Sequence, residues 1–324
     1  MNIGKLILKH GIMLAPMAGF SDYAMRRIAH EYGAEYSVTE MVSAKAVVFG
    51  DEKTRILSRI REEEGPVAIQ LFGSEPDTLA RATEIVTSGG YTGVMPVAID
   101  INMGCPVKKI FSNGEGSALM RDPSLIYRIV WSVVNSTALP VTVKMRLGID
   151  RDSINVFECA EAAESAGASA ICVHGRTRVE MYGGEADIIA VAKVKNCLHI
   201  PLVANGDITS ADKALSALTM CGGDGIAIGR GAIGNPFIFR EIISAIEGKP
   251  YIEPSLNERI EVALRQIGYA IEDKGEAVAI REARGQIAHY FKGFRGAAEC
   301  RFEINRALTL DDVKRAIEKN IEKN

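Results

Sequence analysis

A cysteine between a glycine and a proline is the clearest chemical feature of this sequence, at the end of the stretch Asp100–Pro106. The apolar run before it is typical of a buried strand, and Gly104 and Pro106 restrict the backbone around Cys105 where that strand ends. A thiol with a pKa near about 8.5 is protonated at neutral pH and can donate a proton. The alternative is a buried, inert thiol, which is the usual fate of a lone cysteine.

Polar side chains also stand at the ends of other short apolar runs. Lys144 lies inside such a run, where a buried ammonium group needs an anionic partner. Taken alone, His174 could be a hydrogen-bonded core histidine, and Asn205-Gly206-Asp207 could be an ordinary turn. Their recurrence at one run after another favours a common site. The polar residues at these ends include Gln70, Asn102, Cys105, Lys144, Arg146, His174, Arg176, Asn205, Asp207 and Arg230.

An alternation of aliphatic runs and helical patterns, reaching to about residue 248, must position these side chains. The predicted strands are Ile12–Ala18, Tyr36–Met41, Val67–Phe72, Ala98–Met103, Val141–Leu147, Ala170–His174, Leu202–Asn205 and Gly225–Ile228. Helices are expected after them, as over Asp22–Tyr32, from Ser74, over Pro123–Ala138 and Asn155–Ala166, from Ser210 and after Pro236. Eight strand–helix units favour a closed (β/α)8 barrel, the TIM barrel, over an open parallel sheet. The strand ends would then form one mouth.

The last two strand ends predict a binding site for a phosphate group. Gly206 and Gly229 can bring backbone N–H groups close to a phosphate, and Arg230 adds a positive charge. With Lys144 and Gln70 deeper in the same mouth, the site fits a flat, electron-accepting ring that carries one phosphate, as FMN does. No G-x-G-x-x-G pattern follows the first strand, so a Rossmann-type dinucleotide site is not indicated.

The composition excludes several other classes of protein. A net charge of −3 argues neither for nor against a nucleic-acid partner. The six cysteines form no C-x-x-C pair, so we expect neither a disulfide framework nor a metal site, and a reduced, cytoplasmic protein. The apolar patch within residues 1–14 is too short and too interrupted for a signal peptide or a membrane span.

Six sequence segments together resemble the tRNA-dihydrouridine synthases, and most closely their bacterial B-type subgroup. The segments are Met13–Gly19, Asp100–Pro106, Lys144-Met145-Arg146, His174-Gly175-Arg176-Thr177, Asn205-Gly206-Asp207 and Gly229-Arg230. The Asn-Met-Gly-Cys-Pro signature is highly specific, and the other segments occur in the expected order. The resemblance covers the whole predicted barrel and extends more weakly into the C-terminal part.

The resemblance implies an FMN enzyme that uses NADPH to reduce uridine in tRNA to 5,6-dihydrouridine. Reduced FMN would deliver hydride to C6 of the uracil, Cys105 would be the general acid that protonates C5, and Asn102 would fix the base. The base must leave its stack to be reached. The residues implied to bind the cofactor are Pro16, Met17, Ala18, Gln70, Lys144, His174, Asn205, Gly206, Asp207, Gly229 and Arg230.

The C-terminal part predicts a second contact with RNA. After residue 248 only helical patterns occur, so we expect a catalytic barrel over residues 1–248 and a helical tRNA-binding domain over residues 249–324. On one continuous helix Arg281, Arg284, Lys292 and Arg295 would share a face that follows an RNA backbone. A solvated helix face is the alternative, and Gly285 and Gly293 can break the helix. The substrate contacts that we expect are Asn102, Lys108, Lys109, Arg146, Arg176, Arg281, Arg284 and Lys292.

Two other functions remain alternatives at this point. A dihydroorotate-type reductase of free pyrimidines shares an FMN barrel, but the basic helical part and the form of the cysteine signature speak against it. A non-catalytic RNA-binding protein would not need the full set of polar strand ends. We expect a monomer, or a weakly associating chain.

Overall fold

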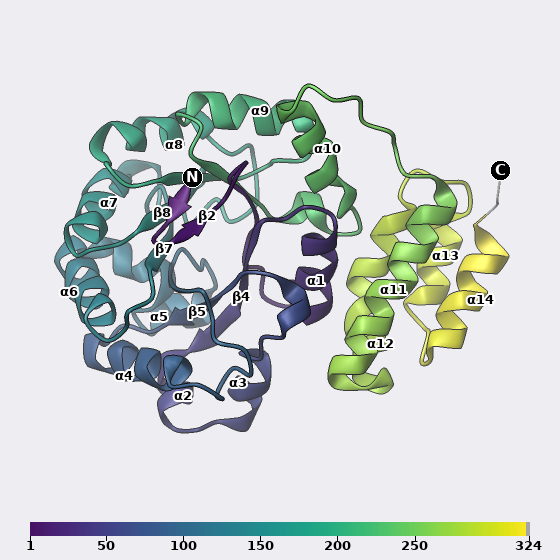
Figure 1. The fold of residues 1–324 in the computed structure, drawn as a ribbon, viewed down its shortest axis with the longest axis horizontal. Helices are drawn as coiled ribbons and strands as arrows, with labels where there is room; N and C mark the ends of the chain where they lie inside the picture. The colour runs from purple at the N-terminus through teal and green to yellow at the C-terminus, as the bar shows by residue number, and fades with distance from the viewer. Residues whose placement is uncertain (322–324) are drawn as a thin grey trace.

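A computed structural model describes residues 1–321 and shows a closed barrel beside a helical region (Figure 1). The eight barrel strands are parallel, and β10 (Gly225–Ile228) closes the barrel by pairing with β3 (Ile12–Leu14). Between them lie β4 (Tyr36–Ser43), β5 (Val67–Phe72), β6 (Ala98–Met103), β7 (Val141–Arg146), β8 (Ala170–His174) and β9 (Leu202–Asn205). The predicted (β/α)8 barrel is therefore confirmed, and the open sheet is excluded.

Helices surround the barrel because each strand returns to the sheet through a helical crossover. They are α1 (Tyr23–Glu31), α4 (Pro76–Thr87), α6 (Pro123–Val134), α7 (Val156–Ser165), α8 (Ile188–Val194), α9 (Ala211–Met220) and α10 (Phe237–Ile246). Shorter helices α2 (Ala44–Val48), α3 (Glu52–Leu57) and α5 (Lys108–Ser112) lie in the connections. Side chains of Asp22 and Asp122 cap the first turns of α1 and α6, which explains where these helices begin.

The first barrel strand is shorter than the sequence predicted. Regular pairing in β3 ends at Leu14, and Ala15 makes one more hydrogen bond to Ile228. The chain then turns, and the Ser21 hydroxyl accepts a hydrogen bond from the backbone N–H of Met17. Residues 16–18 therefore leave the sheet and border the barrel mouth.

A two-stranded hairpin that was not predicted closes the opposite end of the barrel. Its strands are β1 (Asn2–Ile3) and β2 (Leu6–Ile7), which pair antiparallel. Ile3 and the following Leu8 are buried in one cluster with alanines that line the starts of the barrel strands, such as Ala98 and Ala170. The mouth at the other end is consequently the open end of the barrel.

The helical region consists of α11 (Leu256–Lys274), α12 (Glu276–Ile287), α13 (Ala297–Ile304) and α14 (Leu310–Asn320). It packs against α1 and α10, where Ile28 and Phe237 share a buried cluster with Val262 and Tyr290. An ion pair of 2.6 Å between Lys274 and Asp22 adds to this contact. A joint apolar core thus sets the orientation of the helices relative to the barrel.

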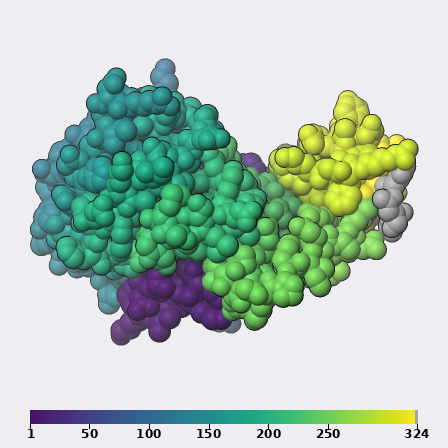
Figure 2. Space-filling model, turned by 90° about the horizontal axis from the view of Figure 1, so that it is seen from above, coloured from purple at the N-terminus to yellow at the C-terminus, as the bar shows by residue number. Residues whose placement is uncertain are grey.

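The two parts of the molecule enclose a hollow on one side. Figure 2 shows the N-terminal residues (purple) on one side of the molecule and the last helices (yellow) toward the other. The hollow lies between those helices and the barrel, on the side away from the N-terminal hairpin. Because the hairpin closes the opposite end of the barrel, this is the side on which the mouth opens.

Candidate active site

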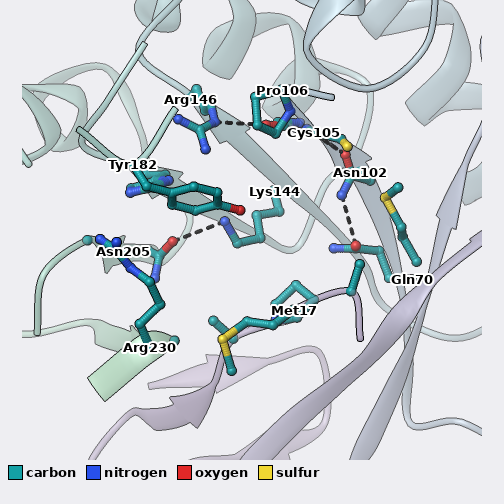
Figure 3. A pocket seen from close by; sticks show the side chains of 18 of the residues that line it. Met17, Gln70, Asn102, Cys105, Pro106, Lys144, Arg146, Tyr182, Asn205 and Arg230 are labelled. Atoms are coloured by element: carbon teal, nitrogen blue, oxygen red, sulfur yellow. Dashed lines mark hydrogen bonds between the residues drawn. The ribbon is translucent and has the colours of Figure 1, made fainter. Parts of the chain in front are cut away.

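A pocket of about 330 Å³ opens at the carboxyl ends of the barrel strands (Figure 3). The residues expected from sequence that line it are Pro16, Met17, Ala18, Gln70, Asn102, Cys105, Lys144, Arg146, His174, Asn205, Gly206, Asp207, Gly229 and Arg230. The structure thus brings together Cys105, all the expected cofactor residues and two of the expected substrate contacts. The remaining substrate contacts do not line this pocket.

Lys144 is a partly buried cation at the base of the pocket. Its ammonium group donates a hydrogen bond of 3.1 Å to the side-chain oxygen of Asn205, and it forms no ion pair with any residue among 1–321. Burial lowers the pKa of Lys144 because a charged amine is poorly solvated there. The site therefore has a positive charge that can accept a negatively charged partner.

His174 is held in its neutral form. Burial, and then the nearby cations Lys144, Arg146, Arg176 and Arg230, together lower its pKa to about 2. An arginine N–H can only donate, so the contact of 3.4 Å between Arg176 and Nε2 makes Nε2 the acceptor and leaves the proton on Nδ1. His174 can therefore donate one hydrogen bond to a ligand without carrying a charge.

Arg176 has a different place from the one that the sequence predicted. It is buried, and its N–H groups bind the carboxylate of Asp207, the ring of His174 and the backbone oxygens of Gly183 and Gly184. These bonds use all five donors of the guanidinium. Arg176 therefore has no donor left for the substrate contact that we expected. It holds Asp207, His174 and the loop after β8 in place.

Asp207 joins two arginines at the mouth. Its carboxylate accepts hydrogen bonds from Arg176 and from Arg230, at 2.6 and 3.0 Å, and from the backbone N–H of Ala186. Burial raises the pKa of Asp207, but these hydrogen bonds outweigh it, and the net pKa lies below its usual range. With this carboxylate occupied, the backbone of Asp207 and the half-exposed Arg230 are the groups left for a phosphate.

Backbone shape explains why a glycine precedes Asp207. Gly206 has φ +130°, which side chains rarely allow, and an added Cβ would meet Ala186 at 2.6 Å and His174 at 3.1 Å. Asp207 itself has φ +50°. This turn directs both residues toward the pocket, next to the end of β10.

Cys105 is fixed by its backbone on both sides. Its N–H donates to the side-chain oxygen of Asn102 at 2.9 Å, and its carbonyl accepts from the N–H and the hydroxyl of Ser117. Gly116 packs so closely that an added Cβ would meet the Cβ of Cys105 at 2.9 Å. Burial raises the pKa of the thiol, so the thiol is protonated at neutral pH.

Gln70 and Asn102 stand side by side at the pocket wall. The side-chain N–H of Asn102 donates to the side-chain oxygen of Gln70 at 2.9 Å, as Figure 3 shows. Both side chains are buried, yet both line the pocket. They can therefore present amide groups to a ligand while they hold each other.

Arg146 ties two loops together beside the cysteine. Its guanidinium donates to the backbone oxygens of Gly104, Thr177 and Met181, each at 2.9 Å. Burial lowers its pKa to about 10, so it stays charged at neutral pH. Nη2 makes no hydrogen bond with the described residues and remains available for a ligand.

Tyr182 is a pocket residue that the sequence analysis missed. Its ring is more than half exposed and lies near the guanidinium groups of Arg230 and Arg146, at 5.0 and 5.7 Å. Figure 3 shows the ring beside Lys144, over the pocket. Tyr182 lies in the loop after β8, where no strand pattern marks it, although an aromatic residue between glycine-rich segments was a usable signal.

The two lysines after the cysteine lie outside the pocket. Lys108 and Lys109 are exposed on α5, which follows directly after Val107 of the pocket wall. The loop that contains them is held to the barrel, because the ring of Phe111 lies 3.8 Å from the guanidinium of Arg178. They remain in position to meet a large ligand at the rim.

The single basic helix face that the sequence predicted is wrong. Helix α12 ends at Ile287, so Lys292 and Arg295 lie in the loop before α13. Arg281 and Lys292 are exposed, whereas Arg284 is partly buried and donates to the backbone oxygen of Ala307. Gly293, with φ +93°, stands in this loop, but Gly285 lies within α12 without breaking it.

Comparison with known proteins decides the family. The family model described as dihydrouridine synthase matches residues 13–324. The chain is 43% identical to tRNA-dihydrouridine synthase B of Pasteurella multocida over 296 residues, which cover 91% of this chain and 88% of that protein. It is 38% identical to the probable tRNA-dihydrouridine synthase of Rickettsia conorii, over 94% of this chain and 91% of that protein.

This chain belongs to the dihydrouridine synthase family. The resemblance recognised in the cysteine signature and the other strand-end motifs is confirmed, and with it the expected enzyme class, an oxidoreductase. Each of those motifs lies at the pocket mouth of this dihydrouridine synthase family member.

Solved structures show the same fold at low sequence identity. An old yellow enzyme homologue from Zymomonas mobilis superposes with a TM-score of 0.52 at 12% identity, over 80% of this chain and 94% of that one. Histamine dehydrogenase from a Rhizobium species gives 0.57 at 14% identity, over 88% of this chain and 50% of that one. These likenesses support the barrel fold.

No group of three or more His, Cys, Asp or Glu side chains among residues 1–321 is arranged to hold a metal ion. Among the helices in the same range, none combines the length and the apolar character needed to cross a membrane.

Proposed function

We propose that this protein is an FMN-dependent tRNA-dihydrouridine synthase that uses NADPH. The observation that carries the proposal is the pairing of a protonated thiol, Cys105, with the partly buried Lys144 cation in one pocket. A reductase of a pyrimidine ring needs both an acid and a positive charge beside its electron carrier. The names of the relatives in Pasteurella and Rickettsia support tRNA as the substrate.

The pocket fits FMN on the character of its donors. Lys144 forms no ion pair among the described residues and can offset negative charge on a reduced ring. Neutral His174 and the amide of Gln70 can bond polar atoms of that ring. Residues 16–18 would form one wall, with Asn205 nearby. The turn at Gly206, the backbone at Asp207 and Gly229, and the side chain of Arg230 would hold the phosphate.

Bound FMN, once reduced, would supply the hydride that C6 of the uracil accepts. Cys105 would then donate its thiol proton to C5, and the thiol holds this proton at neutral pH because burial raises its pKa. Asn102 holds the backbone N–H of Cys105 and would aim the base toward it. Nη2 of Arg146 would bind an oxygen of the uracil or of its nucleotide.

The tRNA would occupy the hollow between the barrel mouth and the C-terminal helices (Figure 2). Lys108 and Lys109 at the rim, and Arg281 and Lys292 on the helical region, are exposed cations that can contact phosphates. The catalytic part would span residues 1–248 and the tRNA-binding part residues 249–324. We infer that the enzyme works in the cytoplasm, as a monomer.

The direct test uses purified protein and unmodified tRNA transcripts. We expect a yellow protein that absorbs near about 450 nm, and dihydrouridine formation that depends on both NADPH and the protein. Free uracil and orotate serve as matched controls and should remain unreduced, which separates this function from a free-pyrimidine reductase. Colourless protein that FMN does not reconstitute, or reduction of the free bases alone, would overturn the proposal.

A further inference from the structure

An aromatic ring on the connection after β6 contacts two arginine side chains beside the pocket mouth. The ring centre of Phe111, on α5, lies 3.8 Å from the guanidinium carbon of Arg178 and 4.4 Å from that of Arg121. Arg178 belongs to the loop after β8, and Arg121 ends the 3₁₀ turn over Gly116–Arg121. Neither arginine is among the substrate contacts that the sequence predicted.

Neither guanidinium forms an ion pair within residues 1–321. The acid nearest in sequence to Arg121 is Asp122, which caps α6 and pairs at 3.7 Å with an arginine of that helix. The acid nearest in sequence to Arg178 is Glu180, which pairs with Arg151 at 2.9 Å. Both of these acids are engaged elsewhere, so the two positive charges have no carboxylate partner in the described part of the chain.

The two positive charges also lie close to each other. Both distances are measured to the same ring centre, so the guanidinium carbons cannot be farther apart than the sum of the two distances. This limit is close to the Debye length at physiological ionic strength, about 8 Å, so the charges repel each other. Contact with the ring offsets part of this repulsion, because the face of an aromatic ring attracts cations. A bound anion would offset the rest.

The contact with the ring leaves hydrogen-bond donors of Arg178 available. Its Nε is buried without a partner, and neither of its terminal nitrogens donates to a residue among 1–321. The side chain as a whole is partly exposed. A guanidinium presents its N–H groups as a planar fork that matches two oxygens of a phosphate, and contact with an aromatic ring holds that fork in place.

Arg146 joins the loop of Arg178 to the loop of Cys105. Its guanidinium donates to the backbone oxygens of Thr177 and Gly104, each at 2.9 Å, and these residues directly precede Arg178 and Cys105. Figure 3 shows Arg146 next to Cys105. Arg178 does not itself line the pocket. It therefore stands on the rim, on the side where Cys105 lies.

We propose that Phe111, Arg121 and Arg178 form a cluster that binds phosphates of the RNA strand carrying the target uridine. The inference rests on the proposed function, because it names a contact that the tRNA makes beside the same pocket. A strand whose base enters the pocket must pass over the rim. Its phosphates then meet the cations that stand nearest to Cys105.

A long polyanion fits this surface better than a nucleotide cofactor does. Lys108 and Lys109 are exposed on α5, the same short helix that carries Phe111, so they extend the positive surface along the rim. None of these side chains lines the pocket in which NADPH would have to reach the flavin. A phosphate chain that runs along the rim can contact several of these cations at once.

The test is the binding of labelled, unmodified tRNA transcript to the FMN-loaded enzyme, followed by fluorescence anisotropy at several salt concentrations. We expect Arg178→Gln to weaken binding about 10-fold, because it removes a hydrogen bond between charged groups. The slope of log affinity against log salt should fall by about 0.7–0.9 for the lost phosphate contact. Arg121→Gln should act in the same direction, and the double variant should bind more weakly than either single variant.

Two further variants separate a phosphate contact from a general effect of charge. Arg81→Gln removes an exposed arginine from α4, where it has no ion pair among the described residues, and should change neither affinity nor slope. Phe111→Leu keeps both charges but removes the ring that holds them. Its affinity should fall by only about threefold, and its slope should stay that of the unmodified enzyme. Flavin content verifies that each variant is folded.

These outcomes separate the inference from the proposed function. If the unmodified enzyme binds no tRNA, the proposed function fails. If it binds tRNA, but both arginine variants bind within about twofold as tightly, the inference fails alone. Weaker binding by the arginine variants with an unchanged salt slope would also overturn it, because the lost contact would not be with a phosphate.

Flavin reduction by NADPH in the absence of tRNA gives an independent check of the partner. Arg178→Gln should be reduced at nearly the original rate, since the cluster lies outside the pocket. Slower reduction together with unchanged tRNA binding would assign the cluster to the phosphates of NADPH and would overturn the inference.

Discussion

Single side chains in the pocket combine charges and burial in ways that a purely structural role does not explain. Lys144 is a partly buried ammonium group with one amide partner and no ion pair within the described chain. Its pKa is depressed in the folded protein, so at neutral pH the folded state is less stable than with a neutral side chain. A stabilising role for Lys144 must therefore come from a bound ligand.

Replacement of Lys144 by Met tests this reading of the charge. Without cofactor, we expect thermal stability equal to or above that of the unmodified protein, because a desolvated charge is removed. FMN affinity should fall about 10-fold, equivalent to about 1.4 kcal/mol. Melting temperature and flavin titration give the two values. The control Lys193→Met, at an exposed site on α8, should change neither value. A Lys144→Met protein that is less stable but binds FMN with full affinity would contradict the account.

Sequence reasoning located the residues that lie on strands and missed those that depend on loops. Cys105 and Lys144 were predictable because each breaks an apolar run at a strand end. Tyr182 and the saturated bonding of Arg176 were not, because both depend on how the loop after β8 folds back. Hydrogen bonds from Arg176 to the backbone oxygens of Gly183 and Gly184 hold this loop, and no side-chain pattern in the sequence indicates such bonds.

At the scale of elements, the connection after β6 positions Cys105, the proposed acid. This connection contains α5 and a 3₁₀ turn over Gly116–Arg121, and it is held to Cys105 through Ser117. Gly116 has φ +60° and contacts the cysteine, whereas Gly114 has φ +77° and nothing within 4 Å of an added Cβ. A side chain at either glycine would strain the backbone, but only one at Gly116 would also press on Cys105.

Replacing each glycine by Ala should give different results. Both variants should lose about 1 kcal/mol of unfolding free energy, since both force a side chain into the left-handed region. Only Gly116→Ala should also slow dihydrouridine formation, by about 10-fold or more, because its Cβ displaces Cys105. Chemical denaturation and single-turnover rates measure the two effects. Equal rates in the two variants would show that the position of the connection does not matter.

Sequence patterns predicted the long, regular elements of this fold better than the short or interrupted ones. Eight barrel strands were predicted because aliphatic runs of strand length recur between helical patterns. The hairpin at the barrel bottom was not, because its strands have two residues each and carry no periodicity. The basic helix was misjudged because α12 ends at Ile287, several residues before Lys292, and only a glycine in the following loop hinted at the break.

At the scale of the whole molecule, the helical region is fixed beside the barrel mouth. Ile28 of α1 and Tyr290 of the helical region lie in one buried cluster, and ion pairs such as Arg61 with Asp273 at 2.7 Å surround it. A packed joint of this kind holds one angle between the two parts. The hollow in Figure 2 therefore has a set shape.

Charge reversal on the helical region tests the proposed docking of tRNA in this hollow. The double variant Arg281→Glu with Lys292→Glu should weaken tRNA binding about 10-fold or more and reduce the slope of log affinity against log salt, by about 0.7–0.9 for each lost phosphate contact. Flavin content should not change. Lys193→Glu is the control, since the end of α8 lies at the closed end of the barrel. Unchanged affinity in the double variant would contradict this docking surface.

The most direct test of the central claim is replacement of Cys105 by Ala in the FMN-loaded enzyme. The account predicts that the variant binds FMN and is reduced by NADPH at nearly the original rate. Re-oxidation by tRNA, followed as the return of flavin absorbance with dihydrouridine measured in the product, should fall about 100- to 10,000-fold, the usual contribution of a general acid. Re-oxidation at the original rate, with dihydrouridine formed, would contradict the assignment of Cys105 as the acid.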